Sequence, residues 1–301
     1  LTSTVFDICI YNGNAFVGGA FGIIKIDSKG VIDTGFSNEF IKGSVYAVEV
    51  NDSGIYLGGE FNVIGTNKNN FIKLNHDGSI SNSFALINSP DAPVYSIISN
   101  DNRIYIGGAF VTFDGVSQRR IAAIEDDKID KDFNVGTGFD DVVRKIKIRR
   151  DGNLLISGNF IRLNGSPANR IVLINQSGNI ISNNFNKLTI GNTVYDIDEI
   201  PGKLFAFGGS FQTTEISPYT GLGVVNAFTS PLPPELTINI NSDISMIYLK
   251  GIPNRSYDIE FSTNLNEWGL LKSIKTDNSG NSSFEFNQKH LDSKYFRAIG
   301  R

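Results

Sequence analysis

The sequence has one cysteine, two histidines and one methionine among its 301 residues. Cys9 alone excludes an internal disulfide, and His76 and His290 are too few for a Cys/His metal cluster. No apolar run reaches the roughly 18 residues that a membrane-spanning helix needs, so we expect no membrane insertion. The formal charge of −4 offers no basic face for phosphate groups, so nucleic acid is not an expected partner.

Helical periodicity is also lacking, and a short motif recurs in its place. The phenylalanines that end the five copies are 40, 49, 50 and 51 residues apart, a period typical of one small sheet per repeat. The copies are Gly18-Gly19-Ala20-Phe21, Gly58-Gly59-Glu60-Phe61, Gly107-Gly108-Ala109-Phe110, Ser157-Gly158-Asn159-Phe160 and Gly208-Gly209-Ser210-Phe211. Glycine inside a strand indicates a bulge or a second backbone passing close by. We expect the phenylalanine to fill the space between adjacent repeats, which stabilises by about 1.5 to 3 kcal/mol.

Each of the first four repeats contains four strand-like segments, and the fifth shows three. An alternating segment and the apolar run before the glycines flank a tight turn, so they form a hairpin. A third apolar segment and a short fourth one follow, the fourth ending in Phe36, Phe84, Phe133 or Phe185. Four short antiparallel strands repeated five times predict an all-β fold, a five-bladed β-propeller. An open solenoid of the same repeats is the alternative.

The repeats end at about residue 228, and the chain then changes character. We predict a propeller over 1–228, a proline-rich linker over 229–235 and a small β-sandwich over 236–301. We expect the sandwich core to be anchored by large side chains, namely Tyr257, Phe261, Trp268 and Phe296. An open ring leaves sheet edges exposed, so Leu1–Thr4 is expected to pair with the last blade.

With its Val-Tyr-Ala-Val hairpin at 45–48 and its Gly-Gly-x-Phe copies, residues 1–228 resemble the bacterial and phage family of delta-60 repeats. Repeat one departs by lacking a long loop, and repeat four by Ser157 and by Arg144-Lys145. The tail is similar to small C-terminal β-modules of secreted bacterial surface proteins. The resemblance implies an extracellular, cell-surface or virion protein, active in adhesion or as part of a phage tail fibre. It implies no catalytic motif.

A polar column follows the hairpin valines, and it is the first candidate site. Taken by repeat it reads Asp7, Ala47, Ser96, Lys145 and Asp196. If the column faces a central channel, Asp7 and Asp196 come from adjacent blades with Lys145 beside them. Such a carboxylate pair could cleave glycans, or it could be a solvated ion-pair cluster lining the channel.

The polar loops after the phenylalanines, at 62–70, 111–120, 161–170 and 212–220, are the second candidate site. Asn70, Arg120 and Arg170 align just before the third strand. The arginines suit carboxylate or sulfate groups of a polysaccharide. Alternatively, each arginine caps its own loop or bridges to the next blade. The acidic run 125–127 lacks the alternating spacing of a calcium loop, so no metal or cofactor is expected.

These patterns favour a non-catalytic binding or adhesion module. Its expected partners are a cell-surface glycan or protein, and other virion or surface-protein subunits. A glycan-active enzyme and a purely structural spacer are the alternatives. Because the chain lacks an initiating methionine and a signal-like start, we expect Leu1 to be an internal or processed start.

Overall fold

The computed structural model is all-β, and every regular element among its described residues is a strand. The chain divides into two compact units, Leu1–Asn226 and Ala227–Arg301. The predicted linker lies outside the described residues except for Glu235. The described residues are 3–36, 39–82, 88–100, 102–182, 185, 190–200, 204–211, 221–226, 235–240, 245–250, 256–264, 266–278, 281–286 and 295–300.

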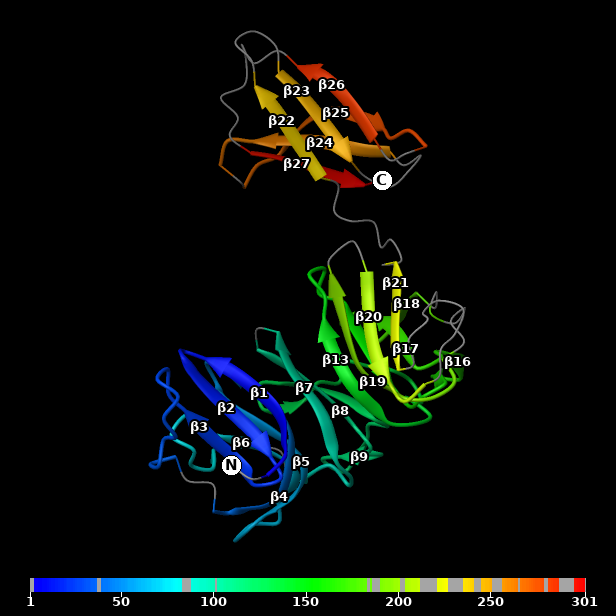
Figure 1. The fold of residues 1–301 in the computed structure, drawn as a ribbon. Helices are drawn as coiled ribbons and strands as arrows, with labels where there is room; N and C mark the ends of the chain where they lie inside the picture. The colour runs from blue at the N-terminus through cyan, green and yellow to red at the C-terminus, as the bar shows by residue number, and fades with distance from the viewer. Residues whose placement is uncertain are drawn as a thin grey trace. The chain divides into compact units, whose positions relative to one another are not determined.

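Among the described residues, the first unit contains five antiparallel sheets of three or four strands that follow one another along the chain (Figure 1), besides two small two-stranded hairpins. Single bridges, Ile26 to Ile32 and Leu74 to Ile80, stand in for a fourth strand in the first two sheets. The strands, sheet by sheet, are β1 (Val5–Tyr11), β2 (Asn14–Gly19) and β3 (Gly22–Ile26); β4 (Ile41–Asn51), β5 (Gly54–Val63) and β6 (Asn69–Leu74); β7 (Val94–Asn100), β8 (Arg103–Gly108), β11 (Ile121–Glu125) and β12 (Lys128–Ile129); β13 (Val143–Ile148), β14 (Leu154–Gly158), β17 (Ile171–Ile174) and β18 (Ile180–Ser182); β19 (Val194–Ile200), β20 (Leu204–Gly209) and β21 (Leu222–Asn226).

A β-bulge interrupts the first strand of every sheet at the same place. In the second sheet Val45 pairs with Gly59 and Ala47 pairs with Gly58, so Tyr46 is the extra residue. The other extra residues are Phe6, Tyr95, Arg144 and Tyr195. A bulge of this kind re-aims the side chains that follow it. Valines three residues apart, such as Val45 and Val48, therefore share one face of the strand.

In the first three motifs, the first glycine makes room for the next sheet. A Cβ built on Gly107 would lie 2.5 Å from Cγ1 of Val143, and one on Gly58 would lie 2.6 Å from Cγ1 of Val94. Gly18 meets Val45 and Val48 in the same way. The apolar side chains that enter this space are fully buried, which makes the contact the centre of each inter-sheet core.

The second glycine admits its own sheet's backbone. A Cβ on Gly59 would lie 2.0 Å from the Ser44 carbonyl oxygen, and one on Gly108 would lie 2.3 Å from that of Pro93. The expected close backbone approach is therefore present at this position. Phe61, Phe110 and Phe160 are buried in the successive inter-sheet cores, as the sequence predicted.

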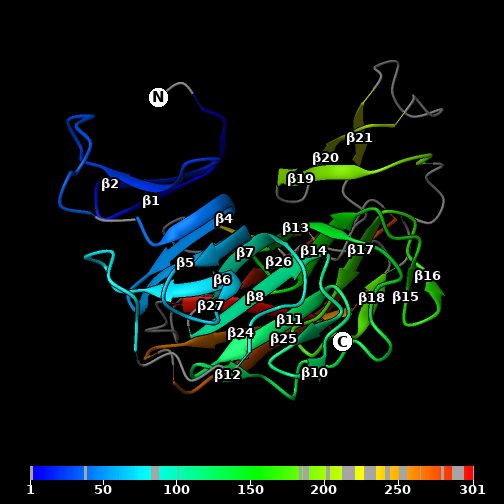
Figure 2. The ribbon, with the colours of Figure 1, turned by 90° about the horizontal axis from the view of Figure 1, so that it is seen from below.

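The five sheets form a row, and Figure 2 shows β1 and β2 at one end with β19 and β20 at the other. Each first strand contacts the next, β1 with β4, β4 with β7, β7 with β13 and β13 with β19. No comparable contact joins β1 to β19 among the described residues. Thr4, expected to pair with the last sheet, accepts a 3.0 Å hydrogen bond from the Ala20 amide of its own sheet. Closure into a five-bladed ring therefore stays a prediction.

The second unit is a sandwich of two three-stranded sheets. Its core contains Ile247, Leu249, Tyr257, Ile259 and Phe284, with Phe296 packed against it. Of the four anchors predicted, Tyr257 and Phe296 belong to this core, whereas Phe261 and Trp268 are half-buried outside the cluster. Arg297 Cζ lies 4.0 Å from the Trp268 ring centroid. The strands are β22 (Glu235–Ile240), β23 (Ser245–Lys250) and β26 (Asn281–Phe286) in one sheet, and β25 (Gly269–Lys275), β24 (Ser256–Ser262) and β27 (Tyr295–Gly300) in the other.

Replacing the first glycine inside the row should be costly. Gly107→Ala places a methyl group against Val143, and overpacking of this kind costs about 1 to 3 kcal/mol. Gly191→Ala is the control, since nothing among the described residues lies within 4 Å of its built Cβ. Urea unfolding should show a lower free energy of unfolding for Gly107→Ala alone. Equal stability of the two variants contradicts this account of the contact.

Candidate functional site

The polar column joins neighbouring sheets. Asp7 Oδ2 accepts a 2.8 Å hydrogen bond from the Val48 amide of the second sheet. Ser96 Oγ, at the same place in the third sheet, accepts one of 3.0 Å from the Ile146 amide of the fourth. The bulge turns these side chains toward the next sheet, where they satisfy a backbone donor.

The expected carboxylate pair is not assembled by the described residues. Asp196 is exposed in the last sheet and accepts a hydrogen bond from the neighbouring Ile197 amide, whereas Asp7 lies in the first sheet. Lys145 lies near Glu49, and its positive charge acts to lower the pKa of that carboxyl. Among the described residues, no hydrogen bond or ion pair therefore joins either aspartate to the other or to Lys145.

Further polar pairs reinforce the same inter-sheet junctions. The Ser99 amide donates to Glu49 Oε1 at 3.0 Å across the second and third sheets, and Ser99 Oγ bonds to the same oxygen. Arg149 forms a two-pronged pair with Glu199, of 2.7 and 2.9 Å, across the fourth and fifth sheets. Burial raises the pKa of Glu49 more than its hydrogen bonds from Ser99 lower it.

The predicted polar loops are short hairpins packed on the phenylalanines. In the third sheet, β9 (Thr112–Phe113) pairs with β10 (Val116–Ser117), and Phe113 is buried 6.2 Å from Phe110 between ring centroids. In the fourth sheet, β15 (Arg162–Leu163) pairs with β16 (Ser166–Pro167). The loop 212–220 of the last repeat lies outside the described residues. A hairpin replaces each open loop because Asp114-Gly115 and Asn164-Gly165 accept the positive φ of a tight turn.

Asn70, Arg120 and Arg170 share a backbone role. Each has a positive φ, 59°, 75° and 72°, and glycines 22 and 221 take the same place in the first and last sheets. The amides of Arg120 and Arg170 donate to the carbonyls of Phe110 and Phe160, both at 2.8 Å. This geometry closes the hairpin onto the sheet, and glycine is the residue that adopts it at least cost.

Their side chains are directed into the protein. Asn70 Nδ2 donates to the Pro90 carbonyl at 3.0 Å, and the Arg120 guanidinium donates to the Ala109 carbonyl. Arg170 Nε is buried without a hydrogen-bond partner among the described residues. Asp127 of the acidic run pairs with Lys73 at 2.8 Å, and the described residues contain no group of three metal-ligating side chains. These side chains therefore present little free charge to a ligand.

The bulged residues form a continuous row across all five sheets, which the sequence reasoning missed. We call Phe6, Tyr46, Tyr95, Arg144 and Tyr195 the aromatic row. The Phe6 and Tyr46 ring centroids are 5.0 Å apart, edge to face, and those of Tyr46 and Tyr95 are 5.4 Å apart, stacked. Arg144 Cζ lies between two rings, 4.4 Å from the Tyr95 centroid and 5.8 Å from that of Tyr195. Each of these contacts stabilises by about 0.5 to 1.5 kcal/mol.

The row is accessible to solvent along its length and has polar neighbours. Its five members are exposed or half-buried, and its ends, Phe6 and Tyr195, are the most exposed. Tyr46 Oη donates to Glu60 at 3.2 Å, and Arg144 Nε donates to Asn159 at 3.1 Å. Glu60 and Asn159 occupy the variable position of the Gly-Gly-x-Phe motif. The signal in the sequence was the large side chain after each hairpin valine.

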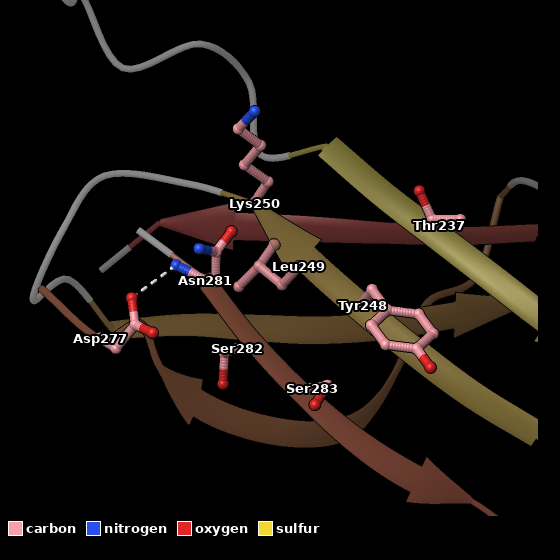
Figure 3. A pocket seen from close by; sticks show the side chains of 8 residues that line it. All are labelled: Thr237, Tyr248, Leu249, Lys250, Asp277, Asn281, Ser282 and Ser283. Atoms are coloured by element: carbon pink, nitrogen blue, oxygen red, sulfur yellow. Dashed lines mark hydrogen bonds between the residues drawn. The ribbon is translucent and has the colours of Figure 1, made fainter. Parts of the chain in front are cut away.

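The second unit carries a shallow pocket of about 390 Å³ over β22, β23 and β26. Figure 3 shows the exposed Tyr248 between Thr237 and Ser283, which come from the two adjacent strands and pair with it directly. The Asn281 amide donates to Asp277 at 2.9 Å at the pocket's edge. One aromatic ring beside two hydroxyl groups offers a second, smaller contact surface.

A family model described as a domain of unknown function (DUF5122) beta-propeller matches residues 52–84, 99–122 and 149–180. These stretches fall in the second, third and fourth sheets. Together with the repeated antiparallel sheets, the match assigns the first unit to the β-propeller class. Comparison with curated proteins gives no match. In the described part of the chain, no helix is long and apolar enough to cross a membrane.

Solved structures that resemble the chain include the computationally designed Ika8 protein, at 11% identity over 93% of this chain and 77% of that one, with a TM-score of 0.44. The Pan2 WD40 domain of Neurospora crassa is 11% identical over 97% of this chain and 91% of its own, with a TM-score of 0.46. The extracellular domain of a hybrid two component system of B. thetaiotaomicron is 13% identical over 92% of this chain and 35% of its own, with a TM-score of 0.40. At such values, none of these likenesses carries an inference about ligand or activity.

Neutralising Glu49 should change how stability depends on pH. Because the pKa of Glu49 is raised in the folded state, the folded state binds the proton of this carboxyl more tightly than the unfolded state does. The resulting contribution to the free energy of unfolding is complete below the unfolded pKa of 4.5 and is lost as pH rises through the folded pKa. Glu49→Gln stays neutral, so its stability relative to the parent chain should increase from pH 4 to pH 7 in urea unfolding. Glu267→Gln, at an exposed position, controls for the lost charge. A constant difference between Glu49→Gln and the parent at both pH values contradicts the expectation.

Proposed function

We propose that the chain is a non-catalytic binding module of an extracellular or virion protein, and that the aromatic row contacts its ligand. The observation that supports this is the row itself, which brings four rings and one guanidinium from five sheets to the solvent. Tyrosine, phenylalanine and arginine are the residues most enriched where proteins bind partners. A rigid β-scaffold holds them in place, so little conformational entropy is lost on binding.

The ligand class that suits the row best is a surface polysaccharide. Each sheet contributes one member at nearly regular spacing, so a polymer of similar sugar rings can meet successive members with similar groups. The faces of the inner rings are covered by their neighbours, which leaves ring edges and tyrosine hydroxyls for contact. Glu60 and Asn159 lie beside them and can hydrogen-bond sugar hydroxyls.

Arg144 favours an acidic polysaccharide over a neutral one. It is the cation of the row, and stacking between Tyr95 and Tyr195 holds its guanidinium near the solvent. A fixed guanidinium binds carboxylate or sulfate groups with charge-assisted hydrogen bonds. Uronic acid or sulfated sugars would therefore gain a contact that neutral sugars lack.

The proposal of no catalysis rests on the polar column. Asp7 is engaged by the Val48 amide, and Asp196 lies in the sheet at the other end of the row. Glycoside hydrolysis needs two carboxylates on either side of one bond. The carboxylates singled out from the sequence are separated, and each contributes to holding the backbone.

Binding can be measured with a glycan array that carries acidic and neutral bacterial polysaccharides, followed by calorimetry with the best binder. Tyr95→Ala should weaken that binding about tenfold, or ~1.4 kcal/mol, because it removes a ring and the support of Arg144. Arg144→Ala should weaken the binding of acidic polysaccharides more than the binding of neutral ones. Tyr248→Ala is the control, because it removes an exposed tyrosine from the second unit.

Three results would contradict the proposal. The first is an array without any bound polysaccharide, which would favour a protein ligand or a structural spacer. The second is unchanged affinity in Tyr95→Ala. The third is loss of binding in Tyr248→Ala alone, which would move the site to the pocket of the second unit.

A further inference from the structure

The same inter-sheet contact is built repeatedly inside the first unit. One sheet provides two apolar side chains three residues apart, and the sheet before it provides a glycine. Val45 and Val48 enter beside Gly18, Val94 and Ile97 beside Gly58, and Val143 and Ile146 beside Gly107. Each contact therefore has two sides, which we call the projecting half (the two apolar side chains) and the receiving half (the glycine). A sheet in the middle of the row presents its projecting half on one face and its receiving half on the other.

The projecting half of the first sheet is exposed, and no described residue receives it. Val5 and Ile8 occupy the places of Val45 and Val48, with the bulge at the same position. The equivalent side chains of the next four sheets are buried, whereas Val5 is 41% and Ile8 56% exposed. Ile10 and Phe6 extend the same exposed apolar face.

In the fifth sheet, no described side chain occupies the receiving half. Gly208 takes the place of Gly58 and Gly107, yet a Cβ built there meets only the Gly221 carbonyl, at 3.8 Å, among the described residues. Tyr195, Leu222 and Val224 are exposed apolar side chains of the same sheet. No described side chain therefore fills the space that a neighbour's valine fills elsewhere.

The polar column and the aromatic row end in matching halves too. Asp7 and Ser96 accept the amides of Val48 and Ile146 in the following sheet. Asp196 occupies that place in the last sheet, where it accepts the Ile197 amide of its own strand. The amide equivalent to those donors in the first sheet is that of Ile8. Tyr195 has one ring face toward Arg144, and Phe6 lies edge to face with Tyr46. Among the described residues, no further member continues the row at either end.

We propose that the last sheet of one chain docks on the first sheet of a second copy, through the contact that joins consecutive sheets within the chain. Gly208 would receive Val5 and Ile8, Asp196 would accept the Ile8 amide, and Tyr195 would continue the row to Phe6. The occupant is a second copy because both halves are present on every chain and match each other, and because the interface continues one that this sequence already forms. Such an interface uses different surfaces on the two partners, so two open rows can close on each other or chains can extend further.

Sedimentation velocity of the full chain across micromolar concentrations tests this. The parent chain should associate as concentration rises. Ile8→Asp should be monomeric, because it places a charge in the projecting half, and Gly208→Val should be monomeric, because it fills the receiving half. Ile64→Asp should associate like the parent, since Ile64 is 57% exposed, as Ile8 is, but lies outside both end faces. Circular dichroism melting shows whether each variant is folded.

A mixture of the two variants gives the sharpest result. Ile8→Asp retains an intact last sheet and Gly208→Val an intact first sheet, so the mixture should form a heterodimer although neither variant associates alone. A parent chain that is monomeric at every concentration overturns the proposal, and so does association that survives either substitution. Two monomeric variants that do not combine overturn the head-to-tail arrangement, because a contact between like faces cannot be restored by mixing.

Discussion

The first unit depends on one contact, in which a valine or isoleucine of one sheet fits where the sheet before it has a glycine, at Gly18, Gly58 and Gly107. Because the fit leaves no space for a Cβ, as at Gly58 and Gly107, it accounts for the first glycine of the repeated motif. The bulge is needed as well, since it brings residues three apart, such as Val94 and Ile97, to the same face. The glycine motif, the bulge and the three-residue spacing thus act together to form the packed contact between consecutive sheets.

In this arrangement, the residues that hold the sheets together differ from the residues that a ligand can contact. In the second, third and fourth sheets, two of the four residues that open the first strand are apolar and enter the preceding sheet. The residue after the bulge can face the following sheet, as Asp7 and Ser96 do. The bulged residue is directed to solvent, and in every repeat it is aromatic or arginine. A ligand surface can therefore vary in sequence without disturbing the inter-sheet cores, provided that the bulge is retained.

The sequence predicted the strands, their hairpins and the roles of both glycines, because these follow from local pattern and from a period that repeats five times. It did not predict where the polar column points, since one extra residue in a strand reverses the side-chain alternation on which that reasoning relied. Arg120 and Arg170 were interpreted by side-chain charge, whereas their shared feature is a positive φ that glycine adopts elsewhere. Ring closure and the place of Trp268 depend on distant contacts, which composition and spacing do not encode.

A double-mutant cycle on Gly58 and Val94 tests the packing contact most directly. Gly58→Ala should destabilise the parent chain, whereas in a Val94→Ala background the added methyl group occupies space that the valine has left. The account predicts that the double variant is more stable than the sum of the single effects by about 0.5 to 3 kcal/mol in urea unfolding. Strictly additive effects would show that the two residues do not share this space, and would contradict the account.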